Sequence, residues 1–143
     1  MINKGSQIKN SKLRGEWAEL RFLTRAVEHG LMVSKPWGDS APYDLMVEHN
    51  GRVLRVQVKS TMYGVNGGYV CKLPHDRSRS ARVRRVEFVA VYIIPEDLWY
   101  ILPARVAAGL KGNIWLTPHR RGHKYERYLE AWHLLLGRNR ARS

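Results

Sequence analysis

The chain has 143 residues, of which 44% are hydrophobic and 26% charged, enough for one compact globular domain. Its 25 Lys and Arg against 12 Asp and Glu give a net charge of +13, which favours a polyanionic partner, nucleic acid or an anionic membrane surface. No apolar run approaches the roughly 18 residues of a membrane span, no signal peptide is recognisable, and the single cysteine excludes an internal disulfide. We expect a basic cytoplasmic protein with one domain over residues 1–143, a core of about 12–136 and basic tails.

Residues 12–30 predict an amphipathic helix that is closed by Gly30. Two glutamates interrupt its pattern, because Glu16 projects into the apolar stripe and Glu19 lies on its edge. Carboxylates directed toward packed surface are costly unless a cation or hydrogen-bond donors meet them. The stripe that we expect to face the core consists of Leu13, Trp17, Leu20, Leu23 and Val27.

Short strands and two further helices are predicted after this helix. A glycine-rich segment, 63–68, is expected to form a turn. The pattern of one helix, several strands and a closing helix indicates an α/β fold with a mixed sheet. The predicted strands are 31–34, 43–49, 52–60, 69–73, 86–94, 98–102 and 114–116, and the predicted helices are 103–110 and 124–136.

The strands at 43–49 and 52–60 form the clearest element, a hairpin around Asn50-Gly51, which suits a two-residue type I′ turn. With these two residues as the loop, cross-strand partners have numbers that sum to 101, so Asp44 lies opposite Gln57. Lys59 shares their polar face, and a diagonal pair such as Asp44 and Lys59 is roughly 7–8 Å apart. That spacing suits two groups on either side of a metal, a water and a phosphate.

This set of side chains fits metal-assisted phosphate chemistry. Mg²⁺ takes oxygen ligands at about 2.0–2.1 Å, and Asp44, the Gln57 amide and the backbone carbonyl of Val58 offer three oxygens. Lys59 can orient a water and stabilise charge that builds on a phosphate. The alternative is an ordinary solvated sheet face, with Asp44 and Lys59 as a weak surface ion pair.

The hairpin resembles the core motif of the PD-(D/E)xK nucleases, and the first helix resembles the opening helix of archaeal-type Holliday junction resolvases and of group I intron homing endonucleases with this fold. The resemblance covers about residues 12–61 well and continues loosely through the later strands and the closing segment. Most of the superfamily has Glu or Asp where this chain has Gln57, whereas the homing branch uses Gln there. The residues concerned are Pro42-Tyr43-Asp44, Gln57-Val58-Lys59 and, in the helix, Lys12-Leu13-Arg14-Gly15-Glu16-Trp17-Ala18-Glu19.

The resemblance implies a restriction-endonuclease-like core, an α/β fold whose mixed central sheet is flanked by helices. It implies Mg²⁺ as cofactor, with Mn²⁺ as an alternative. It assigns Glu16 as a possible additional acid. The implied catalytic residues are Glu19, Asp44, Gln57 and Lys59, and the implied metal ligands are Asp44, Gln57, Val58 and Glu19.

Arginine-rich segments are expected to bind DNA phosphates, because guanidinium groups displace the counterions of the backbone. Ser60 and Thr61, directly after Lys59, are further candidates for phosphate contact. The tail adds Arg138, Arg140 and Arg142. The principal arginines are Arg77, Arg79, Arg82, Arg84, Arg85, Arg120 and Arg121.

Three functions remain open at this point. The first is a metal-dependent endonuclease that cuts duplex or branched DNA as a homodimer or a higher symmetric oligomer, since two strands must be cut. The second is a catalytically inactive DNA-binding module on a degenerate nuclease scaffold, with Gln57 marking the loss of activity. The third is an interaction protein of a ribosome or membrane surface that uses only its basic patches.

Overall fold

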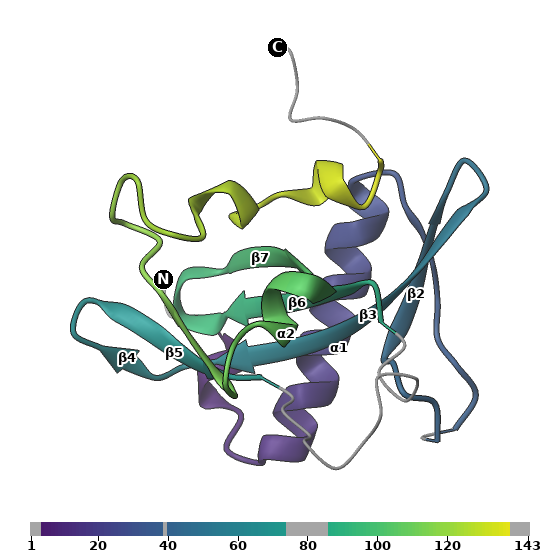
Figure 1. Ribbon diagram of the computed structural model, residues 1–143. Helices are drawn as coiled ribbons and strands as arrows, with labels where there is room; N and C mark the ends of the chain where they lie inside the picture. The colour runs from purple at the N-terminus through teal and green to yellow at the C-terminus, as the bar shows by residue number, and fades with distance from the viewer. Residues whose placement is uncertain (1–3, 39, 74–85, 138–143) are drawn as a thin grey trace.

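A five-stranded mixed sheet forms the centre of the computed structural model, which describes residues 4–38, 40–73 and 86–137 (Figure 1). The strand order is β1-β2-β3-β6-β7, with β3 parallel to β6 and every other neighbouring pair antiparallel. The predicted α/β fold with a mixed sheet is therefore confirmed. The strands are β1 (Met32–Ser34), β2 (Leu45–His49), β3 (Arg52–Thr61), β6 (Phe88–Ile93) and β7 (Leu98–Pro103).

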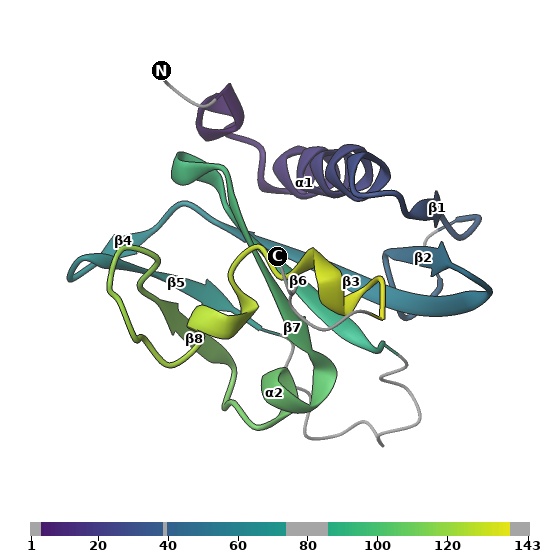
Figure 2. The same cartoon turned by 90° about the horizontal axis from the view of Figure 1, so that it is seen from above.

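Different elements cover the two faces of this sheet (Figure 2). The long helix α1 (Ser11–Glu28) packs on one face, and a small sheet with the order β4-β5-β8 packs on the other together with the short helix α2 (Ala104–Ala108). Among the described residues, no helix is long and apolar enough to cross a membrane. The small sheet consists of β4 (Gly64–Val65), β5 (Gly68–Lys72) and β8 (Asn113–Leu116), and the 3-10 turns are η1 (Lys4–Gln7), η3 (Ile94–Glu96), η4 (Glu126–Tyr128) and η5 (Trp132–Leu134).

The ends of α1 follow from local sequence. The side chain of Asn10 caps the first turn by accepting a hydrogen bond from the Leu13 N–H at 3.0 Å. The helix ends at Glu28, and Gly30 follows with φ +88°, a conformation that glycine adopts without a steric penalty. The predicted helix and its closing glycine are confirmed.

The predicted core stripe of α1 is wrong except for Trp17, which is half-buried and packs against the core. The helix buries Ala18, Phe22 and Ala26, whereas Leu13, Leu20 and Val27 are 55%, 63% and 53% exposed. Alanines on both sides of Phe22 allow the helix to lie close to the sheet, so the phenylalanine reaches between the strands' side chains. Glu16, predicted to project into packed surface, is exposed together with that stripe.

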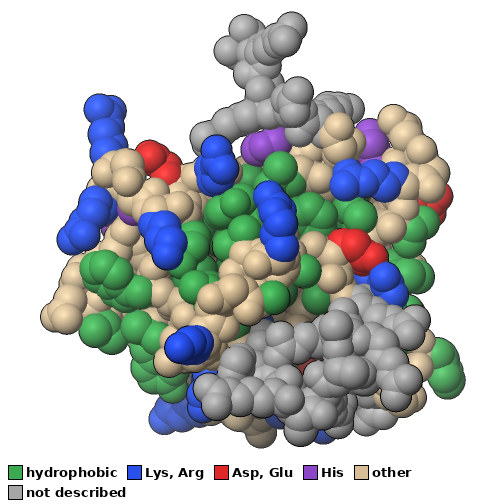
Figure 3. All heavy atoms as spheres, viewed as in Figure 1, with side chains coloured by type: hydrophobic (Ala, Val, Ile, Leu, Met, Phe, Trp, Pro, Cys, Tyr) green, Lys and Arg blue, Asp and Glu red, His purple; other side chains and the backbone are tan. Residues whose placement is uncertain are grey.

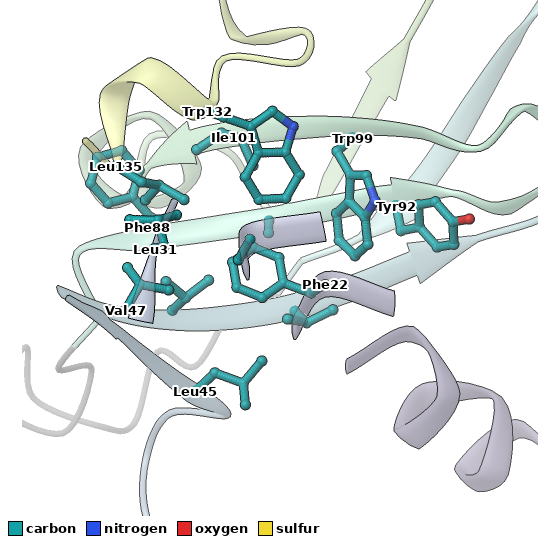
Figure 4. Close-up of a cluster of buried hydrophobic side chains, with 14 of the residues drawn as sticks. Phe22, Leu31, Leu45, Val47, Phe88, Tyr92, Trp99, Ile101, Trp132 and Leu135 are labelled. Carbon is teal, nitrogen blue, oxygen red and sulfur yellow. The ribbon is translucent and has the colours of Figure 1, made fainter. Parts of the chain in front are cut away.

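An aromatic cluster fills the core between α1 and the main sheet (Figure 4). The Phe22 ring lies 5.5 Å from the Trp99 ring and 5.4 Å from the Trp132 ring, measured between centroids. Tyr92 stacks on Trp99 at 4.3 Å. Such offset and edge-on contacts add to the apolar area that these large rings bury.

The helix predicted at 124–136 does not form. The segment instead contains the two 3-10 turns η4 and η5, joined by extended residues and by Glu130 at φ +49°. The Glu130 N–H donates to the Trp99 carbonyl at 2.7 Å, and its carboxylate accepts from the Trp99 N–H at 2.6 Å. Pairing with β7 and the burial of Trp132 outweigh the local preference for a helix.

Candidate active site

The β2–β3 hairpin has the register that its turn predicts. Asn50 and Gly51 have φ values of +50° and +77°, as a type I′ turn requires. The strands pair from His49↔Arg52 to Leu45↔Val56, as predicted. The Asp44 N–H then donates at 3.0 Å to the carbonyl of Val56, the partner of Leu45, so the regular pairing ends there and the predicted direct pair of Asp44 with Gln57 does not form. Asp44 lies against β3 immediately before β2 begins.

The Asp44 carboxylate is held against β3. The Val58 N–H donates to Asp44 Oδ2 at 2.8 Å. In an extended strand the N–H and C=O of one residue point to the same edge, so the Val58 carbonyl is also directed to the edge of β3 that faces Asp44. The sequence predicted this carbonyl as a metal ligand, and its direction is compatible with that prediction.

Glu19 approaches Asp44 from α1. Burial and the nearby charge of Asp44 raise the pKa of Glu19 above its ordinary value, with a smaller contribution from Glu16 in the same direction. Lys35 opposes these effects, since its Nζ lies 3.3 Å from Glu19 Oε1. The fold therefore brings together two carboxylates that are distant in sequence, whereas Glu16 stays exposed.

Gln57 and Lys59 lie on the same face of β3 as predicted, at alternate positions, and both side chains are half-buried. Their neighbours on β6, Val89 and Val91, pack with Cys71 of the small sheet, so Gln57 and Lys59 lie on the face of the main sheet that is turned away from α1 and Glu19. Lys59 also lies near the buried Cys71. Burial raises the pKa of the Cys71 thiol to about 12, and the nearby positive charge of Lys59 acts in the opposite direction. A thiol with such a pKa stays protonated at neutral pH, which favours a structural role for Cys71 over a nucleophilic one.

The donor set fits a hard divalent cation. Two neighbouring carboxylates repel each other, and Glu19 already attracts the ammonium group of Lys35. The Gln57 amide and the Val58 carbonyl would add neutral oxygens of the kind that Mg²⁺ accepts. Within the described residues, no group of three or more His, Cys, Asp or Glu side chains is arranged to hold a metal, so a metal here would need the two neutral oxygens beside the two carboxylates.

Comparisons with known proteins identify the family. A family model described as PD-(D/E)XK endonuclease matches residues 9–135. The chain belongs to the PD-(D/E)XK endonuclease family. The solved structure of a bacterial homing endonuclease, I-Ssp6803I, is similar with a TM-score of 0.77 and 32% identity, over 90% of this chain and 92% of that one. No curated protein sequence matches the chain.

Two features of this PD-(D/E)XK endonuclease were missed in the sequence. Lys35 pairs with Glu19, and a bidentate ion pair links Arg55, two residues before Gln57, to Glu87 with Nη2 to Oε1 at 2.5 Å. Glu87 also accepts from the Arg55 backbone N–H at 2.6 Å. Burial alone would raise the pKa of Glu87, but these hydrogen bonds from Arg55 lower it below the ordinary value. The two partners are 32 residues apart in the sequence, so no local pattern indicates this pair.

The predicted DNA contacts have mixed outcomes. Arg77, Arg79, Arg82, Arg84 and Arg85, like the arginines of the tail, lie outside the described residues. Ser60 is half-buried. Contact through Thr61 is contradicted, because its side chain is 4% exposed and its hydroxyl donates to the Val70 carbonyl at 2.5 Å and accepts from the Tyr63 N–H.

Arg120 and Arg121 are exposed, as a phosphate contact requires. The Arg120 guanidinium lies over the Trp115 ring, 5.5 Å from its centroid, beside a hollow of about 450 Å³ that His123 and Lys124 also line. Figure 3 shows Lys and Arg side chains spread over the face that carries α2, with few acidic ones among them. This charge is suited to phosphate contacts that do not depend on base sequence.

Proposed function

We propose that the chain is a metal-dependent DNA endonuclease that hydrolyses phosphodiester bonds. The observation that carries the proposal is the meeting of Glu19 and Asp44 at the start of β2, where burial and mutual repulsion raise the pKa of Glu19. Proteins rarely keep two such carboxylates together without a cation or a shared proton. In a member of a nuclease family, the cation is the simpler explanation.

Glu19, Asp44, the Gln57 amide oxygen and the Val58 carbonyl would hold the metal, with Mg²⁺ as the first candidate and Mn²⁺ as the alternative. When bound, such a cation polarises the scissile phosphate and lowers the pKa of a bound water. Asp44 is pre-oriented for this role by the hydrogen bond from the Val58 N–H. Glu16 is exposed one turn before Glu19 and would act as an additional acid only by reaching back toward the site.

Lys59 would act on the phosphate itself. An ammonium group on the same face as Gln57 can orient the attacking water and stabilise the negative charge that builds in the transition state. The net charge of +13 would bring the DNA backbone to this site. Two groups of arginines would then bind the DNA on either side of the cleaved bond. They are Arg77, Arg79, Arg82, Arg84 and Arg85, which follow β5 in the sequence, and Arg120 and Arg121, which precede η4.

A duplex is the favoured substrate, since the similar solved structure is that of a homing endonuclease. A branched substrate remains the alternative within the same reaction. Because a duplex has two strands and each chain offers one site, the enzyme would act as a homodimer or a higher symmetric oligomer.

The test is a cleavage assay on duplex and four-way-junction DNA, with Mg²⁺, with Mn²⁺ and with a chelator. We expect metal-dependent cutting that falls at least about 100-fold in Asp44→Ala, with DNA binding retained. Glu48→Ala is the matched control, because Glu48 is an exposed carboxylate on β2, the strand that follows Asp44 directly.

Tight DNA binding without cleavage of any substrate in either metal would overturn the proposal and favour the inactive DNA-binding module. Equal activity of the Asp44→Ala and Glu48→Ala variants would exclude this site as the catalytic centre.

A further inference from the structure

The side of α1 that faces away from the main sheet carries an apolar row, which we call the outer stripe: Leu13, Leu20 and Val27. Their side chains are 55%, 63% and 53% exposed. A spacing of seven residues places them almost in line, because a straight helix drifts by only about 20° per heptad. In Figure 2, α1 is the outermost layer on its side of the main sheet.

Single exposed apolar side chains are ordinary, but several large ones aligned along one side of a helix indicate an interaction surface. The outer stripe runs over fifteen residues, and the fourteen steps from Leu13 to Val27 give a length of about 21 Å at 1.5 Å per residue. Half-buried Leu23 lies beside it and widens the apolar surface. The buried face of α1 is already complete with Ala18, Phe22 and Ala26, so the outer stripe serves no purpose within the described part of the chain.

The charges beside the outer stripe disfavour a polyanion as its partner. The three arginines of α1 are turned away from it: Arg14 donates to the Ile8 carbonyl at 2.8 Å, and Arg21 and Arg25 pair with Asp97 at 2.9 and 3.2 Å. The exposed charges that remain are Lys12, Glu16 and Glu28, with a sum of −1. In a chain of net charge +13, this is a surface on which two copies can meet without mutual repulsion.

We propose that the outer stripe is the contact between two copies of this chain, packed as an antiparallel pair of α1 helices around a two-fold axis at Leu20. A two-fold contact requires that the same surface serve both partners. The outer stripe meets this condition, because Leu13 and Val27 each lie seven residues from Leu20. Leu20 then meets the partner's Leu20, and Leu13 meets the partner's Val27.

This arrangement also orients the two active sites, a consequence that depends on the proposed nuclease function. Glu19 lies about 100° around the helix from Leu20, so it flanks the contact rather than entering it. Rotation about an axis perpendicular to both helices keeps the two Glu19 side chains on the same side of the pair. Both sites would therefore face one side of the dimer, where a single duplex can be cut on both strands.

Oxidative cross-linking of Leu20→Cys tests the position of the axis. Helix axes about 8–10 Å apart bring facing Cα atoms to within about 4–6 Å, which a disulfide can span. The native Cys71 is buried and should not react. We expect a cross-linked dimer for Leu20→Cys alone, little product for Leu13→Cys or Val27→Cys alone, and a dimer when these last two are mixed. Val53→Cys is the matched control, since Val53 is 51% exposed on β3.

Light scattering or sedimentation of the full chain gives an independent measurement. The wild type should have at least twice the mass of one chain, and Leu20→Glu should weaken assembly at least about 30-fold, as loss of a central contact does. Val53→Glu introduces the same charge at a similarly exposed site and should leave the mass unchanged.

A wild type that is monomeric at all concentrations would overturn the inference, as would a Leu20→Glu variant of unchanged mass or a Leu20→Cys variant that never cross-links. These results do not depend on cleavage. If the enzyme cleaves DNA but Leu20→Glu leaves its mass unchanged, only this inference is overturned. If the chain forms a dimer through Leu20 but cleaves no DNA, only the proposed function is overturned.

Discussion

Helix α1 contributes neighbouring residues to two charged clusters, and the pKa of a carboxylate is raised in one cluster and lowered in the other. One, the like-charged cluster, consists of Glu19 and Asp44 with Lys35 at its side. The other, the paired cluster, gathers Arg21 and Arg25 around a single carboxylate of the β6–β7 connection, Asp97. Both contain carboxylates that are partly removed from water.

The paired cluster is complete. Asp97 accepts from Arg21, from Arg25 and from the Tyr92 hydroxyl. Burial alone would raise the pKa of Asp97, but the hydrogen bonds from Tyr92 and Arg21 hold it below its ordinary value. The ionised form is thus favoured by the fold, and the cluster ties α1 to the main sheet.

The like-charged cluster is incomplete. Lys35 only partly offsets the burial of Glu19 and its repulsion by Asp44, so the pKa of Glu19 stays raised. The difference between the clusters shows that charge which the fold satisfies serves its stability, whereas charge left unbalanced indicates a site for a ligand.

The largest effect that would test this contrast is expected for Glu19→Gln. Because the pKa of Glu19 is raised in the folded state, ionisation of Glu19 lowers the free energy of unfolding, and this loss is complete above the folded pKa. Glu19→Gln should therefore melt at a higher temperature than the wild type at neutral pH in the presence of a chelator. The same variant should lose at least about 100-fold in metal-dependent cleavage. Thermal melts with and without Mg²⁺, beside the cleavage assay, measure both.

Glu16→Gln is the matched control for that experiment, because Glu16 is an exposed glutamate one turn earlier on the same helix. It should change neither property. Loss of cleavage in this control would instead assign Glu16 as the additional acid, and a lower melting temperature for Glu19→Gln would show that the like-charged cluster stabilises the fold.

A smaller and opposite effect is expected for Asp97→Asn. Asparagine tolerates the left-handed backbone at this position, φ +52°, so mainly the charge is removed. Since the side chain is 40% exposed, we expect a loss of only about 1 kcal/mol, or about 3–5 °C in melting temperature. The cleavage rate should stay within about twofold of the wild type.

Glu28→Gln provides the comparison for Asp97→Asn, since Glu28 is 58% exposed and lies 3.9 Å from Arg25. Its melting temperature should match that of the wild type. If Asp97→Asn impaired cleavage as strongly as Glu19→Gln, the division between the two clusters would be wrong.

The smallest effect is expected for Glu87→Gln, beside the candidate site. The lowered pKa of Glu87 means that its ion pair with Arg55 stabilises the fold above the unfolded pKa and that this contribution is lost as the pH falls through the folded value. Both side chains are about a third exposed, so the difference from the wild type should not exceed about 1 kcal/mol at pH 7.

Urea unfolding at several pH values checks this expectation. The gap between Glu87→Gln and the wild type should close below about pH 4, near the ordinary pKa of a glutamate. Glu48→Gln, which changes an exposed carboxylate on β2, should show no such pH dependence. A gap that persisted at low pH would assign the effect to packing rather than to the ion pair.

The sequence alone determined the features that depend on short-range geometry. Asn50-Gly51 specified the type I′ turn, the turn fixed the register of β2 against β3, and the period of two along β3 placed Gln57 and Lys59 on one face. Asn10 and Gly30 bounded α1 for equally local reasons. These signals work because each involves residues that are neighbours along the chain or directly across a tight turn.

Only the tertiary structure decided which side of α1 is buried, that the segment at 124–136 pairs with β7 instead of forming a helix, and that Thr61 is closed to solvent. Only it brought Lys35 to Glu19 and Asp97 to Arg21, a separation of 76 residues in the second case. Two apolar stripes on one helix are equivalent in a sequence pattern, and the shape of the aromatic core around Phe22 selects between them.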